Sequence, residues 1–205
     1  MLRAGRVIVA GALLLPACSS AHGSPDGRGT KGASPTPTVS GTASVPVRAN
    51  GAFVRGCGTE VVGELGNHPE RYALVLGPLM LIPLPGYANA PASQFRPRHG
   101  SERQQKVLAV VRSTVRLAIA PSDRDHASLL YDPTKWDRRR IHISDGEPVV
   151  EFVPCRPLED RFGTQFNGAF LVHGPRCVKL VASWAEGRRR VVEAPFGVRS
   201  CRTRA

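Results

Sequence analysis

From Ala52 onward, short apolar or alternating runs are separated by Gly and Pro, a pattern that is typical of β-strands and turns. The longest apolar run covers 72–84 and contains Pro78 and Pro83. Proline removes a backbone donor and breaks the interior of a helix. This run therefore predicts one or two strands, bent at Gly77 and Pro78.

Two further runs, 106–111 and 114–120, lie on either side of Arg112 and Ser113 and are expected to pair with each other. Apolar and polar residues alternate in the second run. Because successive side chains of a strand point to opposite faces, one set of residues is expected to face the core. That set is Val115, Leu117 and Ile119.

Turn signals divide the rest of the chain. Residues 86–101 predict a long loop, and Asp145 and Gly146 predict a hairpin turn. Trp184 is expected on the buried face of its strand. Further strands are expected at 127–131, 139–144, 149–153, 168–173, 178–184 and 190–194. About nine short strands with regularly spaced turns predict an all-β fold, an antiparallel immunoglobulin-like β-sandwich of about seven to nine strands.

The N-terminus has the pattern of an export signal, since Arg3 and Arg6 precede an apolar run over 7–15. The run is far shorter than the roughly 20 apolar residues that span a bilayer. The sequence Leu-Pro-Ala-Cys that ends at Cys18 resembles the lipobox of bacterial lipoproteins. This resemblance implies that 1–17 is a signal peptide and that Cys18 is acylated and becomes the new N-terminus; an ordinary secretory signal is the alternative.

Residues 18–50 are rich in Ser, Gly, Pro and Thr and contain almost no large apolar side chains. Such a segment buries too little apolar surface to offset the entropy of ordering, so it predicts a disordered tether. Residues 51–205 are then expected to form one disulfide-bonded domain.

The cysteines beyond Cys18 are even in number, and in an exported domain such a count predicts two disulfides. Four cysteines allow three connectivities, and positions along the chain favour Cys155 with Cys177 and Cys57 with Cys201. Metal ligation is the alternative, but the chain has no Cys-x-x-Cys pair. We therefore expect no metal and no cofactor.

The formal net charge is +12, and removal of Arg3 and Arg6 with the leader lowers it to +10. Such an excess favours anionic lipid head groups or phosphate-bearing envelope polymers as partners, with a partner protein as a further alternative. Nucleic acid is not expected. Two arginine triplets are the candidate anion-binding residues, unless they serve only as charged, solvated strand edges: Arg138, Arg139 and Arg140, and Arg188, Arg189 and Arg190.

The densest group of acids and histidines surrounds Trp136, which is expected to be exposed and able to stack on a sugar ring. A divalent metal or a sugar is one interpretation of this group, and turn-forming roles for the aspartates are the other. Its members are Asp123, Asp125, His126, Asp132, Asp137 and His142.

Catalytic patterns are weak in this chain. A Gly-x-Ser-x-Gly motif is absent. The nearest candidate for the catalytic residues of a hydrolase is the run from His99 to Glu102, in a proline-rich segment. A blue-copper centre would need an axial ligand such as Met80, which lies in a wholly apolar run and is expected to fill the core. The sequence favours a protein without catalysis.

The distribution of motifs also resembles a set of uncharacterised actinobacterial lipoproteins. The resemblance rests on the lipobox, the tether and four C-terminal stretches, at 152–155, 164–172, 174–178 and 195–197. It implies export and a β-sandwich domain, and it implies no activity.

These features predict a membrane-anchored extracytoplasmic lipoprotein on the outer face of the cytoplasmic membrane or in the cell envelope. Its expected role is that of a non-catalytic binding or structural module. The alternative is an envelope-acting hydrolase or another enzyme that processes carbohydrate or lipid.

Overall fold

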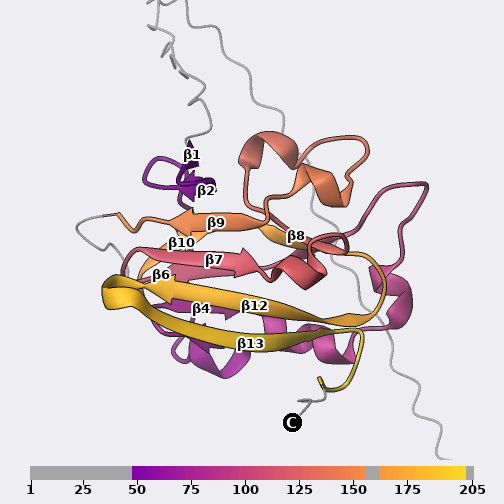
Figure 1. The fold of residues 1–205 in the computed structure, drawn as a ribbon. Coiled ribbons are helices and arrows are strands. Elements are labelled where there is room, and N and C mark those ends of the chain that lie inside the picture. The colour runs from indigo at the N-terminus through magenta and orange to yellow at the C-terminus, as the bar shows by residue number, and fades with distance from the viewer. Residues whose placement is uncertain (1–47, 156–161, 202–205) are drawn as a thin grey trace, which may run out of the picture. The chain divides into compact units, whose positions relative to one another are not determined.

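The computed structural model describes residues 48–155 and 162–201, and this part of the chain is all-β with no α-helix (Figure 1). The predicted leader, Cys18 and nearly all of the predicted tether lie outside the described residues. The strands are β1 Arg48–Ala49, β2 Ala52–Arg55, β3 Leu74–Leu76, β4 Leu79–Ile82, β5 Gln104–Lys106, β6 Leu108–Val111, β7 Val115–Ile119, β8 Ala127–Leu130, β9 Val149–Phe152, β10 Thr164–Phe166, β11 Ala169–Val172, β12 Arg176–Trp184 and β13 Arg188–Phe196.

Short 3-10 helices occupy several of the connections. They are η1 Pro69–Tyr72, η2 Leu84–Asn89, η3 Ala92–Phe95, η4 Pro121–Asp123, η5 Pro133–Lys135, η6 Ile143–Asp145 and η7 Ala185–Gly187. No helix among the described residues is long and apolar enough to cross a membrane.

The strands form three sheets. The first has the order β1-β2-β9-β7-β12-β13, the second β10-β6-β4-β3 and the third β5-β11-β8. All pairs are antiparallel except β2 with β9, which makes the six-stranded sheet mixed. Within the described residues there are 13 strands, more than the predicted seven to nine, because several have only two to four residues.

One apolar core joins the three sheets. It includes the buried face of β7, where Val115, Leu117 and Ile119 are at most 1% exposed, as the alternation predicted. Phe152 and Phe170 bring side chains from the first and third sheets into the same cluster. Full burial of each such side chain contributes roughly 1.5–3 kcal/mol, so this cluster is the main source of stability.

The bend predicted at Gly77 and Pro78 is confirmed, since it separates the paired strands β3 and β4. Gly77 has a φ of +63°, and a Cβ there would lie 2.6 Å from the ring of Trp184. Glycine is therefore required both by the turn and by the close approach of the ring. Trp184 is only partly buried, although it packs against the core.

Two predicted hairpins do not form. Arg112 and Ser113 carry the chain from β6 in the second sheet to β7 in the first, so these runs do not pair. Residues 139–144 form no strand, and β9, after the predicted turn at Gly146, pairs with β2 and β7 instead. Local turn signals identify where the chain bends, whereas packing decides which strands meet.

All four cysteines of the described chain are in disulfides, but the predicted pairing is wrong. Cys57 pairs with Cys155 and Cys177 pairs with Cys201, with Cα–Cα distances of 5.2 and 5.7 Å. Two disulfides indicate an oxidising, extracytoplasmic compartment.

The sheet topology explains this connectivity. Because β2 and β9 are parallel, the chain leaves both strands at the same end, which brings Cys57 beside Cys155. On the other side of the sheet, Cys177 lies opposite Pro195 on β13, and the chain turns at Gly197, where φ is +65°. The turn returns Cys201 to Cys177.

Candidate functional site

A cleft of about 1010 Å³ lies beside β5. One wall is formed by 101–108, and the facing wall is formed by Trp136, Asp137, Arg138 and Ile141. Asn167 and Gly168, between β10 and β11, complete the opening. Ligand sites are typically concave and combine apolar walls with a few polar groups, and this cleft has that composition.

Buried amides hold β5 in place along the cleft. Gln105 is 1% exposed, its Oε1 accepts a 2.8 Å hydrogen bond from Gln94 Nε2, and its own Nε2 donates to the Gln94 carbonyl at 3.1 Å. Gln104 Nε2 donates to the Trp136 carbonyl at 3.0 Å and so ties the two walls together. The shape of the cleft is therefore set by hydrogen bonds between its own walls.

Four polar side chains in the cleft have no partner among the described residues. Arg103, Lys106, Asp137 and Asn167 make no side-chain hydrogen bond or ion pair with any residue in 48–155 or 162–201. Lys106, Asp137 and Asn167 are exposed, and Arg103 is partly buried. These groups are free to meet a ligand, and two of them are cationic.

Behind Trp136 lies a buried guanidinium. Arg55, at the end of β2, is 1% exposed, and its Cζ lies 5.8 Å from the ring centre of Trp136 and 5.5 Å from that of Phe166. Its Nη2 donates to the Thr59 carbonyl at 2.7 Å, while Nε and Nη1 have no partner within the described chain. Burial lowers the pKa of Arg55 to about 10, and the charge of Asp132 partly offsets this effect.

An ionic network holds the wall that carries Trp136. The buried carboxylate of Glu147 accepts from Arg48 Nη2 at 2.6 Å and from Lys135 Nζ at 3.0 Å. Lys135 Nζ also donates to the Asp145 carbonyl at 2.9 Å and lies 3.8 Å from Asp132. These groups link η5 to η6, and η6 is also tied to β8, because Ser128 Oγ donates to the Ile143 carbonyl at 2.6 Å.

A second acid–base contact lies at the end of the cleft. Glu102 Oε1 is 2.7 Å from Nδ1 of His173, and the Glu102 side chain is only 9% exposed whereas that of His173 is 50% exposed. The neighbouring Ser101 Oγ accepts from the Ile141 N–H at 3.0 Å and donates to the Glu102 carbonyl at 3.3 Å. Both hydrogen bonds of the Ser101 hydroxyl are thus made with backbone groups. No serine is hydrogen-bonded to His173 in the described chain.

The two arginine triplets are not brought together. Residues 138–140 belong to the wall near β9 and β8, whereas Arg188, Arg189 and Arg190 begin β13, the edge strand on the other side of the six-stranded sheet. In Figure 1 the yellow β12–β13 hairpin and the orange helices around 133–145 are separated by β7 and β9. The hypothesis of one shared arginine patch is wrong.

All six arginines of the triplets are exposed. Within the first triplet only Arg138 lines the cleft, and it is paired with Asp145. In the second, Arg188 pairs with Glu186 and Arg190 donates to the Val75 carbonyl. The exposed arginines of β13, with these contacts, fit the role of a charged, solvated strand edge.

The predicted group of acids and histidines is dispersed. Asp123 accepts from the Lys179 N–H at 2.8 Å, and Asp132 caps η5 through the Thr134 N–H at 3.0 Å. The contact of Asp132 is the turn-forming role that the sequence offered as an alternative, whereas the Asp123 side chain binds the backbone of the distant strand β12. Only Asp137 lines the cleft, and Trp136 is partly buried instead of exposed.

Sequence reasoning did not identify Arg55, Arg103, Lys106 or Asn167. For Arg55 a signal was present, because it shares the parity of the core residue Phe53 on β2, which places an isolated cation on a buried face. The other three lie in short segments whose surroundings depend on β11 and on the wall opposite.

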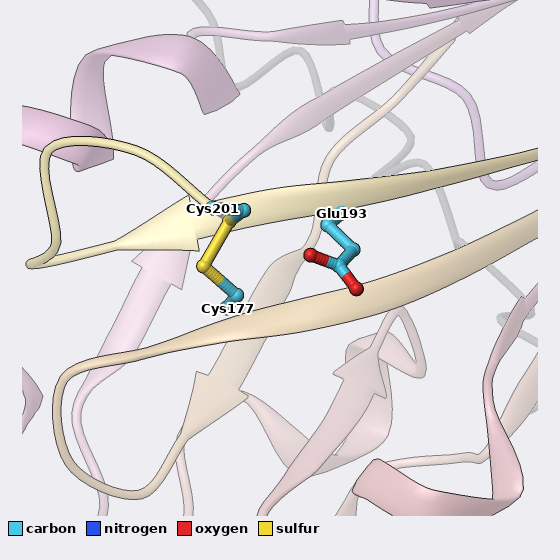
Figure 2. A group of neighbouring side chains, drawn as sticks. All are labelled: Cys177, Glu193 and Cys201. Carbon is cyan, nitrogen blue, oxygen red and sulfur yellow. A yellow bond between two sulfur atoms is a disulfide. The ribbon is translucent and has the colours of Figure 1, made fainter. Parts of the chain in front are cut away.

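One group of residues within the described chain has potential metal ligands close together, namely Cys177, Glu193 and Cys201. Figure 2 shows the disulfide between the two cysteines, with the Glu193 side chain beside it. Cysteine binds a metal ion as the thiolate, and sulfurs in a disulfide cannot supply thiolates. The disulfide therefore links the two ends of the β12–β13 hairpin covalently.

A further cavity of about 610 Å³ is lined by 60–67, Cys155 and 162–165. Comparisons with models of protein families, with curated proteins and with solved structures find no match for this chain. The similarity to bacterial lipoproteins stays a prediction, and the function is inferred from the geometry of the site.

Proposed function

We propose that this protein is a lipid-anchored module of the cell envelope that binds an anionic envelope polymer in the cleft beside β5. The observation that carries the proposal is the pair of cations Arg103 and Lys106, which line a cleft and have no partner in the described protein. Phosphate and carboxylate groups are the natural partners of such cations. The hydroxyls of a polyol or sugar chain suit Asp137 and Asn167.

The location in the envelope is supported by two disulfides and by the predicted leader that ends at Cys18. A cysteine that carries two or more acyl chains would hold the protein firmly at the membrane. The +10 charge of the chain without its leader would then favour an anionic surface or polymer. We extend the proposal to the fold, as an immunoglobulin-like sandwich, because strands of different sheets pack on one apolar core. The three sheets and the parallel pair β2–β9 depart from the two antiparallel sheets of that fold.

An envelope-acting enzyme remains the alternative. Glu102 and His173 have the geometry of a carboxylate that orients an imidazole, but a hydrolase also needs a nucleophile at the other ring nitrogen. The nearest hydroxyl in sequence, Ser101 Oγ, is committed to backbone groups. Binding without catalysis is therefore the simpler use of the site.

The proposal is tested with a phosphate-bearing polyol polymer, with neutral dextran and vesicles rich in phosphatidylglycerol as separate arms. We expect the polymer to bind, dextran not to bind, and binding to weaken with salt, because exposed charges are screened beyond about 8 Å at physiological ionic strength. The double variant Arg103→Ala/Lys106→Ala should weaken polymer binding by about tenfold or more, since each lost charged hydrogen bond costs roughly 1.5–3 kcal/mol.

The matched control is Arg189→Ala/Arg190→Ala, which removes the same charge from β13, far from the cleft. It should leave most of the polymer binding intact. Equal losses in both double variants would show that net charge, and not the cleft, is responsible. Binding to vesicles but not to polymer would assign the site to lipid head groups instead.

A further inference from the structure

Two histidines face each other at the end of the β8–β11 pair. Val172 is opposite Ala127 in the register, so the next residues along each strand, His173 and His126, form a cross-strand pair. The His173 N–H donates to the His126 carbonyl at 2.8 Å. Cross-strand partners place their side chains on the same face, and here the two imidazole rings are stacked at 29° with centres 6.5 Å apart.

Both rings are open to solvent, but one of them is held in a fixed orientation. His173 Nδ1 lies 2.7 Å from Glu102 Oε1, and the Glu102 side chain is about nine-tenths buried. The other carboxylate oxygen, Oε2, is also buried and has no partner among the described residues. Nδ1 is thus occupied by a carboxylate, which leaves Nε2 of the exposed ring as the nitrogen available to a ligand.

A histidine that binds a metal through one nitrogen usually gives its other ring N–H to a carboxylate or a carbonyl. Glu102 supplies this arrangement for His173. Imidazole nitrogens suit Zn²⁺ and Cu²⁺, whereas Mg²⁺ and Ca²⁺ prefer oxygen ligands. Since His126 lies beside the same ring and is exposed, rotation of its side chain can bring a second nitrogen to the ion.

We propose that His126 and His173 form a surface site for a divalent transition-metal ion, Zn²⁺ or Cu²⁺, with Glu102 as the carboxylate that positions His173. Water completes the coordination. The site lies at the outer strand of the three-stranded sheet, β8, and it is separate from the disulfide group of Cys177 and Cys201. Glu102 also lines the cleft, but the two histidines do not.

The test is calorimetric titration of Zn²⁺ and of Cu²⁺ into the full chain, prepared without an affinity tag and with both disulfides intact. We expect one site, with Cu²⁺ bound more tightly than Zn²⁺ and no binding of Mg²⁺ or Ca²⁺. His126→Ala and His173→Ala should each weaken Zn²⁺ binding by about tenfold or more. Glu102→Gln should weaken it by about tenfold, as expected for loss of a carboxylate that orients a metal ligand.

The matched control is His68→Ala, because His68 also pairs with a carboxylate, that of Glu70, but has no second histidine described beside it. Its Zn²⁺ affinity should equal that of the wild type. Absence of Zn²⁺ binding by the wild-type chain, or wild-type affinity in either His126→Ala or His173→Ala, would overturn the proposal. An unchanged affinity in Glu102→Gln would overturn the positioning role.

These readouts are independent of the polymer assay, since the metal site uses neither Arg103 nor Lys106. Thermal unfolding of each variant controls for folding, and the exposed histidine rings make a loss of structure unexpected. Polymer binding with no Zn²⁺ binding would remove the metal site alone, and the reverse result would remove the proposed function alone.

Discussion

The β12–β13 hairpin and the segment 131–147 both carry many charged residues, but they hold them in opposite ways. On β12 the buried positions Val178, Leu180 and Ala182 are fully covered, and the charges of the hairpin point to solvent. The segment 131–147 contains no strand, and several of its charges are buried and paired with one another.

The difference shows why the number of charges is a poor guide to their role. The arginine triplets dominate the composition, yet all six side chains are exposed. Among the arginines that the structure describes, Arg55 alone is buried, behind Trp136, and its removal from water must be offset by neighbouring groups. The hairpin is closed by the disulfide Cys177–Cys201, whereas Cys57–Cys155 joins the chain after β2, next to Arg55, to the chain after β9.

The largest expected effect is the loss of a disulfide. In the chain-entropy model, a separation of 98 residues makes Cys57–Cys155 worth about 4.7 kcal/mol, and a separation of 24 makes Cys177–Cys201 worth about 3.5 kcal/mol. The double variant Cys57→Ser/Cys155→Ser should therefore lower the free energy of unfolding more than Cys177→Ser/Cys201→Ser. Urea unfolding measures both, and the reverse order would contradict the view that the first disulfide restrains more of the unfolded chain.

The next effect concerns Arg55. Arg55→Ala should lower the free energy of unfolding by about 2–4 kcal/mol, because it leaves a cavity between Trp136 and Phe166. Arg55→Met should stay within about 1 kcal/mol of the wild type, since a buried charge is often replaced by an apolar side chain at little cost. A loss in Arg55→Met as large as that in Arg55→Ala would show that the charge itself stabilises the fold.

The lowered pKa of Arg55 predicts how the stability difference between the wild type and Arg55→Met depends on pH. Because burial lowers the pKa of Arg55 in the folded chain to about 10, below its value in the unfolded chain, the charged form opposes folding below pH 10, and this penalty fades as the pH rises above 10. The difference in unfolding free energy between Arg55→Met and the wild type should be constant from about pH 6 to 9. It should shift in favour of the wild type only above about pH 10.

The smallest change in the free energy of unfolding is expected from arginine substitutions on the β12–β13 hairpin. Replacing Arg188, Arg189 and Arg190 with Ala one at a time should change the free energy of unfolding by about 0.5 kcal/mol or less in each case. The ion pair of Arg188 with Glu186 is exposed on both sides, so water screens it. Urea unfolding at low and high salt checks this, and a loss comparable with that of Arg55→Ala would abolish the contrast between the two regions.

The local pattern of the sequence determined where several strands lie. The alternation in β7 and the apolar run broken at Gly77 and Pro78 predicted strands that the structure confirms. The even number of cysteines beyond Cys18 likewise predicted that all four are oxidised. These predictions succeed because strand parity, turn residues and pairing of thiols are local or compositional properties.

The tertiary structure alone decided which segments meet. The parallel pairing of β2 with β9 directs Cys57 to Cys155, and no local signal encodes it. The same holds for the cleft, whose walls come from β5, the 136–141 segment and the turn before β11. Contacts between residues far apart in the chain depend on how whole sheets pack. For that reason the sequence pointed to arginine triplets, while the fold placed Arg103 and Lys106 in the cleft and His126 beside His173.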